Sequence, residues 1–223
     1  MAPKRKTPTR AQRPSPYPST LAVSLPVAQT VKIADNGDIV LLVGEEAKQR
    51  RLQVSSFMLR AASKTFNVMF GPDFQEGREL SFTRPKDVML PDDDPEAIEL
   101  ICRIVHLHND ELPETLKPDQ ILSFARLVDK YELHRTVYLA ADRWLVAPKV
   151  LLDESIKELG KMMLAADLMN HERGFGRITK AMVYDTNESC LPVVSAHHEE
   201  DLWSTICKSD ILSLTPCLRN YAK

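Results

Sequence analysis

Five consecutive apolar residues, Ile39-Val40-Leu41-Leu42-Val43, restrict the possible folds of this chain more than any other segment. A short, continuous apolar run of this kind is typical of a buried strand. An Asp35-Asn36-Gly37 turn precedes the run, and a polar turn over residues 44–49 follows it. Residues 51–54, with the sequence RLQV, then predict a strand that returns beside the first. The two strands together predict a hairpin.

Short helices and a third strand are predicted after the hairpin. Ser55 or Ser56 is placed to cap a helix that ends near residue 62, and Ser63 is placed to cap another that ends near Phe70. Val88-Met89-Leu90 predicts the third strand, because the residues are apolar and Pro91 ends the run.

The remainder of the chain has the pattern of helices. Asp94 is the expected N-cap of the first of them, Pro95 suits the first helical position, and Glu96 favours the positive end of the helix dipole. Apolar residues then recur at helical spacing, and residues 185–223 show the same pattern more weakly. We therefore expect an α+β fold, a small sheet with a helical cluster, followed by a small helical C-terminal extension. The apolar residues that would share one face of each predicted helix are Ile98, Ile101, Cys102 and Val105; Ile121, Phe124, Ala125 and Val128; Val137, Ala140, Ala141 and Trp144; Ile156, Leu159, Met163 and Ala166; and Phe175, Ile178 and Met182.

Charge is divided unevenly along the chain. The first 34 residues hold six Lys or Arg and no acid, so the other 189 residues hold 23 basic and 31 acidic side chains. An acidic body does not attract nucleic acid through its phosphates. No apolar run approaches the roughly 20 residues of a membrane helix, and no signal-peptide core follows the first Met. We expect a protein of the nucleus or the cytoplasm that binds neither nucleic acid nor membrane.

Residues 1–30 are predicted to form a disordered, basic, Pro-rich tail. The first 20 residues are rich in Pro, Ser, Thr and basic residues, and they hold too few apolar residues to offset the entropy cost of ordering. Lys4, Arg5 and Lys6 resemble a short nuclear import signal. A solvated basic tail without that role accounts for the same residues.

Three patterns look like chemical sites but are incomplete. Cys102 and His106 stand four residues apart on a predicted helix, with no second ligand pair near them in sequence, and Asp92–Asp94 lack the ligand spacing of an EF-hand. Arg173-Gly174-Phe175-Gly176 copies the first half of an RNA-binding signature, without the aromatic residues of the second half. The sequence holds no nucleophile elbow, phosphate loop or HExxH motif. We therefore predict no enzyme, no metal and no cofactor.

One continuous stretch is similar to a known family. LQVSSFMLRAASKTFNVMF, residues 52–70, follows the pattern F-x-a-H-r-x-v-L-a-a-x-S-x-x-F-x-x-m-F from its Leu59 onward. Asp38-Ile39-Val40-Leu41 matches the start of the same family, and Asp129-Lys130-Tyr131 matches its later D-K-Y hallmark. Over residues 31–146 the chain resembles the BTB/POZ domain, and most of all the short single-BTB proteins common in fungi. Residues 148–223 resemble the start of the helical segments that follow such domains.

The resemblance implies a homodimer. It places Asp38 and the apolar residues of the first short helix at the dimer interface. The family's His and the basic residue after it are replaced by Ser55 and Ser56, so Asp38 would lack its usual partner, and Arg60 is the candidate substitute. Residues 77–87 look like an insertion before the third strand. The expected interface residues are Asp38, Phe57, Met58, Arg60 and Ala61.

The resemblance also implies a partner. In BTB proteins that recruit the cullin scaffold of a ubiquitin ligase, an apolar-x-Glu motif follows the Met-Phe pair, and Phe74-Gln75-Glu76 fits it. The candidate partner-binding residues are Met69, Phe70, Phe74 and Glu76. We expect an adaptor that brings a client protein, which the sequence does not identify, to a cullin.

Two alternatives to this adaptor stay open. In the first, Phe74 folds back onto the domain while Glu76 is solvated. In the second, the protein is a nuclear scaffold with no ligase role. An enzyme on an unrelated helical fold ranks far behind.

Overall fold

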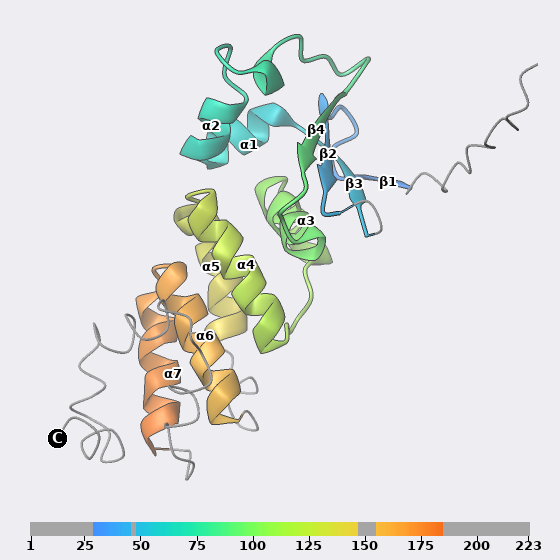
Figure 1. Ribbon diagram of the computed structural model, residues 1–223. Helices are drawn as coiled ribbons and strands as arrows, with labels where there is room; N and C mark the ends of the chain where they lie inside the picture. The colour runs from blue at the N-terminus through green and yellow to red at the C-terminus, as the bar shows by residue number, and fades with distance from the viewer. Residues whose placement is uncertain (1–28, 46–47, 147–154, 185–223) are drawn as a thin grey trace, which may run out of the picture.

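The computed structural model describes residues 29–45, 48–146 and 155–184 (Figure 1). Within these ranges, four strands form one sheet, accompanied by seven α-helices and two short 3₁₀ helices. The predicted α+β class is therefore confirmed. The predicted import signal, most of the predicted tail and the weak pattern after residue 184 lie outside the described residues.

The sheet has the strand order β1-β3-β2-β4. Strands β2 and β3 are antiparallel, with Leu41 opposite Leu52, which confirms the predicted hairpin. Every residue of β2 is buried, as its apolar run predicts. The flanking pairs, β1 with β3 and β4 with β2, are parallel. The strands are β1 (Thr30–Lys32), β2 (Ile39–Val43), β3 (Arg50–Val54) and β4 (Lys86–Leu90).

The parallel pairing of β4 with β2 requires a long connection, because parallel neighbours cannot be joined by a tight turn. Helices α1 (Ser56–Ala62) and α2 (Lys64–Met69) and the segment after them supply it. The Ser63 hydroxyl accepts a hydrogen bond from the backbone N–H of Phe66, which confirms it as the cap of α2. Ser55 stands in the N-cap position of α1, without a side-chain capping bond. The crossover thus carries two short helices at one side of the sheet, as Figure 1 shows.

The later helices form a cluster that begins against the sheet. Asp94 caps α3 (Pro95–Val105) by accepting from the backbone N–H of Ala97 at 2.8 Å, as predicted. Helix α6 packs on α4 and α7, and α7 packs on α5, so the predicted C-terminal extension lies directly against the preceding helices (Figure 1). The remaining elements are α4 (Pro118–Lys130), α5 (His134–Val146), α6 (Ile156–Leu168), α7 (Glu172–Tyr184) and the 3₁₀ helices η1 (Gln75–Gly77) and η2 (Asn109–Glu111).

A buried polar cluster joins these parts. The Asp93 carboxylate is 4% exposed and accepts hydrogen bonds from the Tyr131 hydroxyl and from Lys130 Nζ, the latter at 2.5 Å. The Ser63 hydroxyl donates to the Tyr131 carbonyl oxygen at 2.6 Å, and the Tyr131 ring stacks on Phe66 with 4.4 Å between centroids. Burial is the main cause that raises the pKa of the Tyr131 hydroxyl, and the bond to Asp93 adds to it, so this group stays a donor.

We predict that Tyr131→Phe lowers the free energy of unfolding by about 1–3 kcal/mol, because it leaves a buried carboxylate oxygen without its donor. Urea unfolding measures the change. Tyr138→Phe is the matched control, since Tyr138 is 44% exposed, and it should change stability little. Equal losses in the two variants would contradict a structural role for the Asp93 bond.

Candidate functional site

The chain after α2 forms a compact loop, residues 70–77, which we call the Phe74 loop. Helix α2 ends at Met69, and Phe70 is its C-cap. The Phe74 backbone N–H then donates to the Gly71 carbonyl, and the Gly77 N–H donates to the Phe74 carbonyl. An added Cβ on Gly77 would overlap the backbone of Phe70 and Gly71, so only glycine fits this close approach. The loop therefore closes back on the end of α2.

Two basic side chains fasten the Phe74 loop. The Arg78 guanidinium donates to the carbonyl oxygens of Pro72 and Asp73, at 3.1 and 3.3 Å. Lys86, the first residue of β4, donates through Nζ to the carbonyls of Gln75 and Arg78. The segment that looks like an insertion thus holds the loop in place. Sequence reasoning did not find these bonds, since the only signal for them is two basic residues in a polar stretch.

The Phe74 loop and α2 border an open hollow of about 440 Å³. Phe74 is 48% exposed, Val68 is 57% exposed, and Met69 and Glu76 are partly buried beside them. Three of the four predicted partner-binding residues, Met69, Phe74 and Glu76, therefore line one surface. The hollow is also lined by Val68, which sequence reasoning missed, and by Lys64, Thr65 and Glu132.

Phe70 is the exception among the predicted partner-binding residues. Its side chain is 1% exposed and stacks on Phe66, with 5.8 Å between ring centroids. The prediction that Phe70 contacts a partner is therefore wrong for its side chain. Phe70 instead fixes the end of α2 to the core, and this fixes where the Phe74 loop begins.

A second apolar surface lies on α1. Phe57 is 73% exposed, and Ala61, one helical turn later, is also exposed; we call these two residues the Phe57 patch. Met58 is partly buried and packs against the core, so it offers less surface than predicted. The Ser55 backbone N–H donates to His106 Nε2 at 3.0 Å, which joins the start of α1 to the end of α3.

Asp38 is partnered by backbone and hydroxyl groups rather than by a basic residue. Its carboxylate accepts from the Ser56 backbone N–H at 2.7 Å and from the Ser56 hydroxyl at 2.6 Å. The proposed substitute, Arg60, donates instead to the Asn67 side-chain oxygen at 3.2 Å. The prediction that Arg60 replaces the missing partner of Asp38 is therefore wrong. Ser56 is the substitute, because a serine at the start of a helix presents both a hydroxyl and a free N–H.

The residues that resemble chemical sites are used structurally. Both nitrogens of the His106 ring have partners, since Nδ1 lies 2.8 Å from the Cys102 carbonyl and Nε2 accepts from Ser55. Burial is the main cause that raises the pKa of the Cys102 thiol to about 12, so it does not offer a thiolate. Arg173–Gly176 lies within helix α7 rather than on a strand. Among the described residues, no group of three or more His, Cys, Asp or Glu is placed to hold a metal ion.

Comparison of the chain with models of known protein families gave no match, and comparison with curated proteins gave none either. In the described ranges, none of the helices is both long enough and apolar enough to cross a membrane. The inferences about function below rest on the hollow beside the Phe74 loop and on the Phe57 patch.

The bond between Ser55 and His106 predicts acid sensitivity. Nε2 accepts only when it is unprotonated, and burial, with a smaller contribution from His108, lowers the pKa of His106 below its ordinary 6.5. The stability that neutral His106 contributes is therefore fully present above the unfolded-state pKa, and it is lost as the pH falls through the folded-state pKa.

The measurement is the free energy of unfolding against pH for the wild type and for His106→Gln, which does not titrate. The stability advantage of the wild type should shrink as the pH falls below about 6.5. Parallel curves over this range would show that the bond does not depend on protonation. Because only the difference between the curves is used, other titrating groups common to both proteins cancel.

Proposed function

We propose that this chain is a BTB/POZ protein, a homodimeric interaction module without enzymatic activity that brings a client to a cullin-based ubiquitin ligase. The motif over residues 52–70 and the Asp129-Lys130-Tyr131 triplet support the family. The structure is compatible with it, since a hairpin, two short helices, a further strand and helices follow one another in the expected order. The observation that carries the adaptor role is the half-exposed Phe74 beside Val68 and Glu76.

The chemistry of the hollow suits a protein partner. A half-exposed aromatic ring next to an exposed apolar side chain supplies an anchor that a partner can cover, and buried aromatic anchors dominate the binding energy of interfaces. The Glu76 carboxylate at its edge can accept charge-assisted hydrogen bonds that fix orientation. Because the Phe74 loop is fastened by Arg78 and Lys86, little conformational entropy is lost when a partner binds.

A second candidate function is a BTB scaffold that dimerises but binds no cullin. It needs only the Phe57 patch, which lies on α1 and is not part of the lining of the hollow. The exposed Phe57 ring, with the exposed Ala61 one turn later, offers an apolar surface that a second copy of the chain can cover. Both functions need the dimer, and only the first needs the Phe74 loop.

We predict that Phe74→Ala weakens binding to the N-terminal region of a cullin scaffold from the same source by tens-fold, which corresponds to roughly 2 kcal/mol. Glu76→Lys should also weaken it, by placing the wrong charge against the partner. Phe82→Ala is the matched control, since Phe82 is 68% exposed but does not line the hollow. Titration calorimetry measures the affinities, and thermal melts check that each variant is folded.

Two results would contradict the adaptor role. One is a wild type that does not bind the cullin at high micromolar concentration, which would favour the scaffold. The other is a Phe74→Ala variant that unfolds, which would show that the ring is a structural element of the loop.

We also predict that the protein is a dimer and that Phe57→Asp shifts it toward monomer. A two-fold interface buries the same residue from both copies, so one substitution places two carboxylates close together. Light scattering at micromolar concentration measures the mass. Phe82→Asp should leave the dimer intact, and a wild type that is monomeric under these conditions would overturn the prediction.

A further inference from the structure

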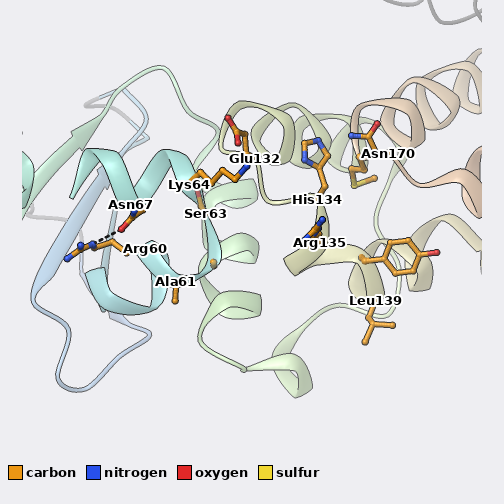
Figure 2. A pocket seen from close by; sticks show the side chains of 13 residues that line it. Arg60, Ala61, Ser63, Lys64, Asn67, Glu132, His134, Arg135, Leu139 and Asn170 are labelled. Carbon is orange, nitrogen blue, oxygen red and sulfur yellow. Dashed lines mark hydrogen bonds between the residues drawn. The ribbon is translucent and has the colours of Figure 1, made fainter. Parts of the chain in front are cut away.

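A long groove separates the short helices from α5. It has a volume of about 1130 Å³ and runs from the α1–α2 corner, along one side of α5, to the turn between α6 and α7 (Figure 2). Lys64 and Glu132 line both this groove and the hollow beside the Phe74 loop, so the two surfaces adjoin. Phe74 itself lies outside the groove.

The groove is basic although the chain as a whole is slightly acidic. Arg60, Lys64 and Arg135 line it and are all exposed, whereas Glu132 is its only acidic lining residue. Over residues 29–45, 48–146 and 155–184, no carboxylate forms an ion pair with any of these three cations; the one partner seen is the neutral amide of Asn67, bonded to Arg60. Figure 2 shows Lys64 and Arg135 on opposite walls of the groove, while the Arg60 guanidinium is turned toward Asn67. Unpaired cations on two facing walls favour a negatively charged ligand.

The groove also has an apolar end. Leu139 lines it and is 83% exposed, the highest value among the exposed large apolar side chains. Tyr138 lines the groove beside Leu139, but its ring stacks on His171 at 4.5 Å between centroids, so one ring face is already used. Leu139 therefore offers this end of the groove an apolar contact for a ligand side chain.

The walls of the groove are fixed to one another. The Thr136 hydroxyl donates to the Ala62 carbonyl at 3.0 Å, which ties α5 to the end of α1. His134 Nε2 lies 3.1 Å from the Leu168 carbonyl, which ties α5 to the end of α6. The groove is thus built by the fold before any ligand arrives, as is usual for binding sites.

We propose that this groove binds an acidic peptide segment of another protein, with its carboxylates against Arg60, Lys64 and Arg135 and an apolar side chain against Leu139. Identifying the owner of that segment as the client of the adaptor rests on the proposed function; the binding itself does not. A nucleic acid fits less well, because an overall acidic chain repels a dense polyanion and the groove offers no free aromatic pair for base stacking.

The test uses fluorescence anisotropy on the full chain. The probe is a short fluorescein-labelled peptide of Glu and Asp with Leu residues spaced between them. It should bind, and raising the salt concentration should weaken it, because exposed charges are screened. The same peptide with Lys in place of every acid should bind much more weakly. Equal binding of the two peptides, or tighter binding of a labelled single-stranded oligonucleotide of equal charge, would overturn the assignment.

Variants place the binding in the groove. Arg135→Glu should weaken the acidic peptide about tenfold, since it removes one attraction and adds a repulsion. Leu139→Ser should weaken it as well, while Arg84→Glu, an equal charge change on an exposed residue outside the groove, should have only the small effect of net charge. Circular dichroism checks the fold of each. An unchanged affinity in folded Arg135→Glu would overturn the proposal.

The two proposals fail separately in these assays. Phe74→Ala should bind the acidic peptide as the wild type does, and Arg135→Glu should keep its affinity for the cullin scaffold. Loss of peptide binding in Phe74→Ala, with binding retained in Arg135→Glu, would place the peptide on the Phe74 loop instead of the groove and would contradict this inference.

Discussion

The buried hydrogen bond between Asp93 and Tyr131 joins the segment between β4 and α3 to the end of α4 inside the core. Asp93 stands between β4 and α3, Tyr131 ends α4, and Ser63 at the corner of α1 and α2 donates to the Tyr131 carbonyl. Apolar packing is not directional, so it allows helices to slide, whereas a buried carboxylate tolerates only a geometry in which its oxygens are satisfied. Both candidate binding surfaces include residues next to this cluster, such as Lys64 and Glu132. Their shape therefore depends on it.

Local signals in the sequence predicted the individual elements well. The Ile39–Val43 run, the Ser63 cap and the Asp94-Pro95 helix start each depend on residues within a few positions of one another, and each appears as expected. Apart from the β2–β3 hairpin, the sequence did not predict which strands pair. The three-residue β1 gave no clear strand pattern, and the parallel partnership of β4 with β2 is decided by the packing of the whole crossover.

The predicted site residues show the same difference between features set by nearby residues and features set by packing. Phe74 and Glu76 were found because a short motif places them, and the structure brings them to one surface with Met69. Phe70 and Arg60 were misjudged because motif position says nothing about which way a helical side chain faces: one points into the core and the other reaches Asn67. The groove was invisible to sequence reasoning, since Arg60 and Arg135 come from helices far apart in the chain.

Lys86 has a consequence for the order in which the chain can fold. Its backbone N–H donates to the Asp38 carbonyl, where β4 joins the sheet, while its ammonium group fastens the Phe74 loop. The bond from Lys86 to the Gln75 carbonyl therefore forms together with the pairing of β4 and β2, which joins the residues furthest apart in sequence within the sheet. The order of the Phe74 loop is thus coupled to the completion of the sheet through one side chain.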